Sequence, residues 1–404
     1  MNRLATAIVF VLACSAFIGC SVYDPGLIKD EGNGGRKING GLPPRPNVPD
    51  DGTDTGTASF AITNIIVDQK DAWKNVGLNL DGFDTTETNP VGECKPPDQS
   101  QGVPLDGDNG IDNQIGQKLL VLVNALIPGF QVHLNDAHKR GEGTILWEIS
   151  EWNGTANDSK VRITIYVAAD GTSLPADEVH WDDATRQLLQ NSDDMPAPPP
   201  DYSSPSGRRT FFVRASNFTT GGSPTPFLLD TNGYVSDGTM VFRYPSGKTL
   251  IINEGEGSLN LRLSEGFLLA KFAPDFKSIS SGFLAGRFPV TDLLEAGGSI
   301  GICGCARCVI EDNVYTLADV LSAESSYDGT GNQDCDALSI GIPYDGVAAD
   351  IETVDKNGAL FVTRDPRLPD FCVDMGMTNL NCMMPDVRKM CGLVGPAPAA
   401  SGLP

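Results

Sequence analysis

Basic residues are scarce in this 404-residue sequence. Its 29 lysines and arginines stand against 52 aspartates and glutamates, so the formal net charge at pH 7 is −23. The phosphate backbone repels an acidic surface, and proteins that bind nucleic acid normally carry the opposite charge. The same excess of acid disfavours adsorption to anionic lipid headgroups. The charge balance therefore excludes nucleic acid as a partner, and any membrane attachment must depend on other chemistry.

A hydrophobic run long enough to span a bilayer is also lacking. The most apolar stretch, Leu4–Ile18, has about 15 residues, whereas a spanning helix needs about 20. A run of this length that follows a positive residue, here Arg3, is typical of a secretory signal. The sequence therefore predicts export rather than a membrane-spanning helix.

The run ends with Gly19 directly before Cys20. A small residue in front of a cysteine resembles the lipobox of bacterial lipoproteins, with Phe17 in place of the usual leucine. The resemblance implies that residues 1–19 are removed, that the sulfur of Cys20 is diacylated and that its new amino group is acylated. Three acyl chains exceed the two signals that stable anchoring needs. The alternative is an ordinary signal peptide with an incidental cysteine.

The address implied by this resemblance is the bacterial outer membrane, because Ser21 rather than aspartate follows the cysteine. The chain also resembles the uncharacterised exported lipoproteins of myxobacteria and their relatives. The shared features are the segment from Gly19 to Pro25, an Asp-Gly loop before a helix, and Trp152-Asn153-Gly154 at the end of a strand. That group implies no activity.

Sustained alternation of helices and strands is absent, which disfavours a parallel doubly wound sheet. Instead, many short segments with a period of two are separated by turn signals, a pattern typical of antiparallel sandwiches and barrels. We predict a mainly β fold, a jelly-roll-like antiparallel β-sandwich with a few short helices. The predicted strands are 58–67, 144–152, 160–167, 210–214, 239–244, 249–253, 258–263, 266–272 and 278–288. The predicted helices are 115–126, 314–322 and 386–390.

Histidine is rare, and the three histidines lie far from most of the ten cysteines. Removal of Cys14 and acylation of Cys20 leave an even number of cysteines, which in an exported chain indicates disulfides, although eight cysteines allow 105 pairings. These eight are Cys94, Cys303, Cys305, Cys308, Cys335, Cys372, Cys382 and Cys391. A zinc site or a redox pair in the cluster from Cys303 to Cys308 are the alternatives.

Composition divides the chain into five parts. A segment rich in Gly, Pro, Asp and Thr cannot bury enough apolar surface to order itself, and most cysteines lie beyond residue 300. The predicted divisions are a signal peptide (1–19), a lipidated cysteine with a disordered tether (20–57), a β-sandwich body (58–299), a disulfide-stapled region packed on the body (300–395) and a disordered tail (396–404).

The strongest candidate site is an acidic loop before the predicted helix, residues 105–113. Oxygen side chains at alternate positions, with glycines that permit a sharp bend, suit the six to eight oxygen ligands of calcium. The loop resembles the first half of the calcium loops of EF-hand, dockerin and thrombospondin type-3 modules. A second acidic segment, residues 79–84, completes the predicted site. The candidate calcium ligands are Asp106, Asp108, Asp112, Asp81 and Asp84.

Calcium binding has a plain structural alternative. Asp and Gly favour turns, and Asp112 is placed to cap the helix that follows it. Gly110 stands where calcium loops carry their fifth-position ligand, and Lys118 lies just beyond the twelfth position, where an acid is missing. The two interpretations are compatible.

One predicted strand carries Trp147, Glu148, Glu151 and Trp152. It faintly resembles the acidic strand of laminarinase-like sandwich glycosidases, with Ser150 in place of the middle acid. Side chains alternate along a strand, so the two glutamates point to opposite faces, a poor arrangement for paired hydrolytic acids. The tryptophans could stack on sugars or pack in the core.

These features predict a lipid-anchored envelope protein that is a non-enzymatic binding or structural module on a flexible stalk. Its expected partners are the membrane, through the acyl chains, and a carbohydrate or an envelope protein. The alternatives are an envelope polysaccharide hydrolase of sandwich fold, or an accessory subunit of an envelope complex.

Overall fold

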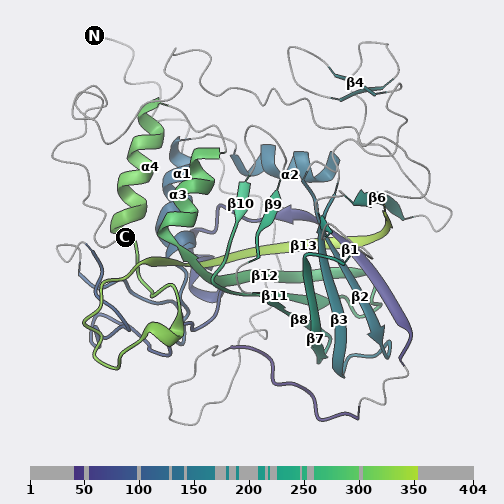
Figure 1. The fold of residues 1–404 in the computed structure, drawn as a ribbon, viewed down its shortest axis with the longest axis horizontal. Coiled ribbons are helices and arrows are strands. Elements are labelled where there is room, and N and C mark those ends of the chain that lie inside the picture. Colours follow the sequence, from purple (N-terminus) through teal and green to yellow (C-terminus); the bar gives the residue numbers. More distant parts are fainter. Residues whose placement is uncertain are drawn as a thin grey trace, which may run out of the picture.

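The computed structural model describes residues 41–49, 54–97, 102–126, 130–140, 143–168, 179–181, 188–190, 208–213, 217–218, 225–245, 248–252, 259–299 and 304–353. Within these ranges the chain forms a curved sheet with helices gathered at one end (Figure 1). Among the helices so described, none combines the length and the hydropathy needed to cross a bilayer.

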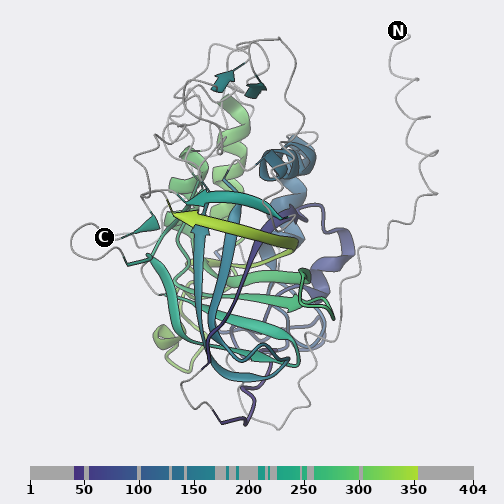
Figure 2. The ribbon, with the colours of Figure 1, turned by 90° about the vertical axis from the view of Figure 1, so that its right-hand side faces the viewer.

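The sheet is a closed barrel of eight antiparallel strands in the order β1-β2-β3-β7-β8-β11-β12-β13 (Figures 1 and 2). The strands are β1 (Gly56–Ile65), β2 (Ile145–Trp152), β3 (Asp158–Val167), β7 (Leu228–Ser236), β8 (Thr239–Tyr244), β11 (Glu265–Phe272), β12 (Ser278–Pro289) and β13 (Ala337–Thr353). The barrel closes because β13 pairs with β12 on one side and with β1 on the other.

The predicted β-sandwich is therefore wrong, although the mainly β character is correct. A sandwich consists of two separate sheets with unpaired edges, whereas here the first and the last strand of one sheet meet and remove the edges. The closing strand β13 lies within residues 300–395, the segment that the sequence placed outside the body.

Shorter elements surround the barrel. A parallel strand, β6 (Arg209–Val213), extends the end of β13, and β4 (Val179–Trp181) with β5 (Leu188–Gln190) and β9 (Leu250–Ile252) with β10 (Leu259–Leu261) form two small ribbons. The helical elements are η3 (Lys70–Asn75), the π-helical turn η5 (Ile115–Leu119), α1 (Leu120–Leu126), α2 (Phe130–Arg140), α3 (Val290–Ser299), α4 (Gly304–Thr316) and η8 (Glu324–Ser326).

Two of the three predicted helices can be compared with these elements. The prediction of a helix over 115–126 is confirmed by η5 and α1 together. The predicted helix 314–322 overlaps only the last turn of α4, and the chain that follows runs into β13. The predicted helix 386–390 lies outside the described residues.

The interior of the barrel is filled by side chains that alternate along the strands. In β8, Met240, Phe242 and Tyr244 belong to the interior cluster. Val241, which lies between them in the sequence, points outward and belongs to the cluster on the outer wall. At the centre, the ring of Trp147 packs against Phe242, with centroids 6.1 Å apart. Much of the outer wall is also buried, which explains why β11 is apolar on both faces.

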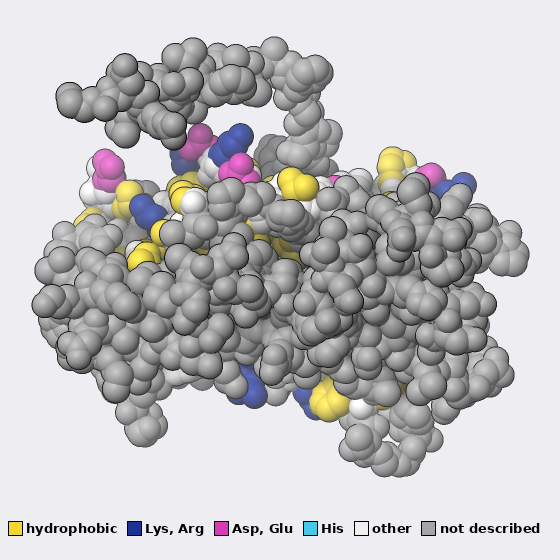
Figure 3. Space-filling model, turned by 90° about the horizontal axis from the view of Figure 1, so that it is seen from above, with side chains coloured by type: hydrophobic (Ala, Val, Ile, Leu, Met, Phe, Trp, Pro, Cys, Tyr) yellow, Lys and Arg dark blue, Asp and Glu magenta, His cyan; other side chains and the backbone are white. Residues whose placement is uncertain are grey.

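The two ends of the barrel differ. The tight turns β2–β3, β7–β8 and β11–β12 lie together at what we call the hairpin end, where Trp152 stacks on Phe272 with centroids 5.2 Å apart. At the opposite, helix end, side chains of η5, α1 and α4 such as Leu119 and Val314 join the interior cluster. Seen from above, the described side chains mix apolar groups with both signs of charge (Figure 3).

Candidate metal centre

The described residues 66–97 and 102–112, which follow β1, form a loop layer over the outer wall of β8, β11 and β12. Its apolar contacts are Val76, Leu78 and Leu80, all buried against that wall. Asp, Asn and Gly shape the rest of the layer by local turns. The Asn79 side chain accepts a hydrogen bond from Gly82 N at 2.6 Å and donates one to Phe83 O at 2.7 Å. The turn directs Asp81 inward.

Asp112 joins the two acidic segments of the loop layer. Its backbone N–H donates to Leu78 O at 3.0 Å, and its Oδ2 accepts hydrogen bonds from Leu80 N at 2.6 Å and Asp81 N at 3.2 Å. Asp112 therefore stabilises the 79–84 turn. The sequence predicted that its side chain caps the following helix, but the side chain bonds to this turn instead.

Asp106 is held from the other side. Its Oδ2 accepts a hydrogen bond from Thr85 N at 2.6 Å, and its own N–H donates to Thr85 O at 3.0 Å. The next residue must be glycine, because a Cβ at Gly107 would lie 2.4 Å from Lys74 O. The backbone at Gly107 therefore passes close to Lys74, next to Asp106.

As a result, Asp81, Asp106 and Asp112 form an acid cluster in which one carboxylate oxygen of each lies within 4.8 Å of the others. The sequence named all three as ligands of one site. The other two candidates lie outside the cluster: Asp84 and Asp108 are exposed, and Asp108 contacts the layer through its backbone N–H to Lys74 O.

The electrostatics of the acid cluster strongly disfavour three negative charges without a counterion. Burial, opposed in part by the Phe83 amide, raises the pKa of Asp81 to about 6. Burial and the charge of Asp81 raise the pKa of Asp106 to about 8. The pKa of Asp112 lies well above its ordinary range, first because of burial and then because of the charges of Asp81 and Asp106.

A cluster of this kind can hold either protons or a cation. Backbone N–H groups of Phe83, Thr85 and Leu80 donate hydrogen bonds to Asp81, Asp106 and Asp112 respectively, which restricts how each carboxylate can turn. Hard cations such as calcium prefer carboxylate oxygens and complete their shell with carbonyls and water. The donor set, three protein carboxylates, is therefore of the right chemistry for calcium.

The sequence did not reveal the ion pair that borders the cluster. Arg287 of β12 is fully buried, and its guanidinium pairs with both oxygens of Glu93 and, through Nε, with Glu265 at 3.1 Å. It also donates to Leu80 O at 2.5 Å and Leu321 O at 2.6 Å. Burial alone would lower the pKa of Arg287, but Glu93 and Glu265 raise it. These partners come from sequence positions too distant for a local pattern to indicate.

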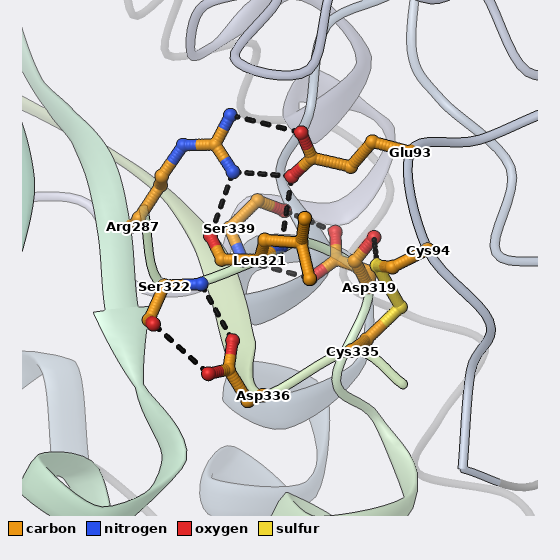
Figure 4. The surroundings of a disulfide bond; sticks show 9 residues. All are labelled: Glu93, Cys94, Arg287, Asp319, Leu321, Ser322, Cys335, Asp336 and Ser339. Carbon is orange, nitrogen blue, oxygen red and sulfur yellow. Dashed lines mark hydrogen bonds and ion pairs between the residues drawn. A yellow bond between two sulfur atoms is a disulfide. The ribbon is translucent and has the colours of Figure 1, made fainter. Parts of the chain in front are cut away.

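Asp319 and the disulfide lie beside this ion pair (Figure 4). The carboxylate of Asp319 accepts hydrogen bonds from Ser339 N at 2.8 Å and from Ser339 Oγ at 2.5 Å. Burial raises the pKa of Asp319 to about 7, against the opposing effect of the Ser339 hydrogen bonds. Cys94 and Cys335 form a disulfide that attaches the loop layer to the segment leading into β13.

The disulfide prediction is confirmed for Cys94 and Cys335, and Cys308 in α4 is also disulfide-bonded. Because its sulfur is in a disulfide, Cys308 has no thiolate to offer zinc, whereas the alternative of a redox pair with Cys305 stays a prediction. Of the remaining predicted cysteines, Cys305 is placed only by its backbone in α4. Those outside the described residues are Cys303, Cys372, Cys382 and Cys391, and so is Cys20.

The other predicted site residues lie apart from the acid cluster. Trp147 is 0% exposed and Trp152 is 6% exposed, so each ring packs in the core and offers no open face to a sugar. Glu151 forms an exposed salt bridge with Arg162 at 3.1 Å. Glu148 is half-buried on the outer wall near Tyr166, and burial raises the pKa of Glu148.

Comparison with protein-family models, with curated proteins and with solved structures found no match for this chain.

Proposed function

We propose that this chain is a lipid-anchored protein of the bacterial outer membrane whose barrel is a rigid binding or structural module. The proposal starts from Gly19-Cys20 at the end of an apolar run, which resembles a lipobox. The observation that carries it into the folded part is the Cys94–Cys335 disulfide. Disulfides persist in oxidising compartments such as the periplasm and are rare in the cytosol. The sequence at Gly19-Cys20 supports anchoring, and the Cys94–Cys335 disulfide supports export to an oxidising compartment.

Replacement of the anchoring sulfur tests this proposal. In Cys20→Ser the thiol is lost while residues 41–353 are unchanged. The protein should leave the envelope lipid fraction and should no longer incorporate labelled palmitate. Cys14→Ser is the matched control, because it removes a cysteine from the same apolar run and should leave both readouts as in the native protein. A Cys20→Ser protein that still carries palmitate would contradict the proposal.

Calcium at the acid cluster is the second part of the proposal. The support is the approach of Asp81, Asp106 and Asp112 to within 4.8 Å, together with the raised pKa values that their mutual repulsion and burial cause. A divalent cation would compensate the carboxylates and hold the 79–84 turn against the 105–112 turn. Its role would be to stabilise the loop layer.

Ligand linkage gives a direct test of calcium binding. At a free calcium concentration about 100 times Kd, the native state gains about 2.7 kcal/mol, which raises Tm by several degrees relative to chelator. Asp106→Asn should lose most of this increase. Asp108→Asn, an exposed acid of the same loop outside the cluster, should keep it. An increase that is equal in both variants, or absent from the native protein, would contradict a calcium site here.

Binding is favoured over hydrolysis as the task of the barrel. Glu148 and Glu151 have different partners, and Glu151 is occupied by Arg162, so the strand provides no pair of acids facing one substrate. We propose a carbohydrate or an envelope protein as the ligand. A glycan array combined with a reducing-sugar assay separates the two activities: binding without product supports the proposal, and product formation supports a hydrolase.

A further inference from the structure

Residues 41–49, which the sequence assigned to the tether, lie against the barrel as a strap. Tyr234 Oη donates a hydrogen bond to Pro43 O at 2.6 Å, and Ser236 Oγ donates one to Pro44 O at 2.8 Å. Leu42 packs against the apolar cluster of the outer wall. Two carbonyl oxygens and one apolar side chain therefore hold the strap against the barrel.

Arg45 adds a second set of contacts to the strap. Its guanidinium donates to Ser159 O in β3 and to Asn232 O in β7, the latter at 2.7 Å. The same group lies 4.6 Å from the centroid of the Tyr234 ring, a cation–π contact. Four prolines of the strap restrict its unbound conformations, so less entropy is lost when it docks.

The hydrogen bonds with Ser159 and Ser236 are at the hairpin end of the barrel, whereas Leu42 packs on the outer wall. Ser159 begins β3 and Ser236 ends β7, next to the β2–β3 and β7–β8 turns. The strap leads to β1, whose first residue Gly56 pairs with Trp152 at the same end. In Figure 1 the dark purple strap passes below the barrel, whereas α1 to α4 lie above it. The chain thus enters the barrel opposite the helices.

We infer that the docked strap makes the hairpin end the membrane-facing end of the molecule and directs the helix end away from the lipid. The inference rests on the proposed lipid anchor at Cys20. With the strap docked, residues 21–40 are the whole connection between the acyl chains and the barrel. The sequence predicts that they belong to a disordered tether, and a Gaussian chain of 20 residues has an rms span of about 25 Å, against roughly 30–35 Å for the full predicted tether.

This reach is short compared with the barrel body. A compact body of about 300 residues has a radius of gyration of about 19 Å and is therefore about 50 Å across. To bring the helix end to the lipid, the tether would have to stretch to about twice its rms span. For a Gaussian chain this extension is roughly a few hundred times less probable than no extension at all. The inverted orientation is therefore rare.

Charge favours the same orientation. Although the chain as a whole carries −23, acids and bases are balanced in the strap and the strand ends around the hairpin end. The acids are Asp54, Glu151, Asp158, Asp237 and Asp275. The bases are Arg45, Lys160, Arg162, Lys271 and Lys277. Among the described residues, this end therefore carries no excess of negative charge that would repel anionic headgroups.

Energy transfer to a headgroup dye tests the orientation on the full lipidated chain. A donor is attached through a bio-orthogonal residue either at Asp275, in the β11–β12 turn, or at Val121, an exposed residue of α1. The protein is bound to phosphatidylcholine vesicles that contain a trace of headgroup-labelled lipid. Transfer from position 275 should exceed transfer from position 121 several-fold.

A strap variant shows whether docking sets the reach. Leu42→Ser with Arg45→Ala should lower transfer from position 275, while Arg243→Ala, which removes an arginine lying over Phe267 on the same wall, should not. Equal transfer from both donors, or a reversed order, on vesicle-bound protein would overturn the orientation. Protein that does not float with the vesicles would contradict the lipid anchor instead.

Discussion

Arg287 is a charged side chain with no exposed surface, and it contacts the loop layer, β11 and the segment that follows α4. A buried ion pair adds little net stability compared with apolar side chains of similar volume, because desolvation offsets the attraction. Removal of one partner is different, since it leaves an uncompensated charge in the interior. The main effect of Arg287 is therefore to compensate the buried charge of Glu93, and its net contribution to stability is small.

We predict that Arg287→Met lowers the free energy of unfolding by about 3–5 kcal/mol, because Glu93 remains buried without its partner. The double variant with Glu93→Gln should regain part of that loss, since the amide can still accept the hydrogen bond from Leu321 N. Urea denaturation of the native protein and the three variants measures the coupling. Additive effects of the two substitutions would contradict the account.

Asp319 should make stability depend on pH. Burial raises its pKa from 3.8 to about 7. Its favourable contribution to the free energy of unfolding is therefore complete below about pH 4 and is lost as pH rises through 7. The rise corresponds to about 4 kcal/mol. In chelator, Asp319→Asn should therefore weaken the decrease in unfolding free energy between pH 4 and 8. Asp275→Asn, in an exposed turn, should leave it unchanged, and an unaltered profile in Asp319→Asn would refute the assignment.

At this scale the sequence indicated the acid cluster because its acids lie in two local, turn-forming segments. Asp84 and Asp108 fit the same spacing rule but point outward, since the rule describes a self-contained calcium loop and this site combines two turns. Glu93, Arg287 and Asp319 are assembled only by the closed barrel. No local pattern could have indicated them.

Among the elements, α2 shows how a helix can complete a sheet. Gln131 Oε1 accepts hydrogen bonds from Val67 N and Asp68 N, just beyond the end of β1. One turn later, Asn135 bonds both Ile65 N, at 2.8 Å, and Ile65 O, at 3.0 Å. The two side chains are four residues apart and share one helix face. They satisfy backbone groups where β1 leaves the barrel.

We predict that Asn135→Ala costs about 1–3 kcal/mol, because the backbone N–H and carbonyl of Ile65 both lose their side-chain partner. Val132→Ala, at an exposed position of the same helix, should change stability by less than about 0.5 kcal/mol. Thermal melts of both variants measure the difference. Equal effects would show that α2 is held by other contacts.

Most strands were predictable because turn signals separate them, as they do for β2, β3, β8, β11 and β12. Two barrel strands were missed. In β7 the Asp-Thr-Asn-Gly run resembles a turn, and the strand pairs irregularly with β3. In β13, Gly341 and Gly346 resemble breakers, but a Cβ there would lie 2.2 Å from Val76 O and 2.6 Å from Ala61 O. The glycines permit close backbone approach, and without β13 closure of the barrel could not be predicted.

For the whole molecule, the Cys94–Cys335 disulfide joins positions 241 residues apart. Cys94 belongs to the loop layer and Cys335 directly precedes the strand that closes the barrel. The crosslink thus restricts the unfolded chain over most of its described length, and it fixes the loop layer where Glu93 meets Arg287.

We predict that Cys94→Ala with Cys335→Ala lowers the free energy of unfolding by about 5 kcal/mol, the loop-closure entropy of a crosslink of this length. Denaturation under oxidising conditions measures the loss. Under reducing conditions the native protein should approach the variant. A variant as stable as the oxidised native protein would show that the crosslink does not constrain the unfolded state.

The central claim is that acyl chains on Cys20 hold the barrel at the membrane. The most direct measurement is the mass of the N-terminal peptide of protein purified from the envelope. The account predicts a chain that begins at Cys20 and carries the added mass of a diacylglyceryl group and an amide-linked acyl chain. A peptide that begins elsewhere, or that begins at Cys20 without lipid, would contradict it.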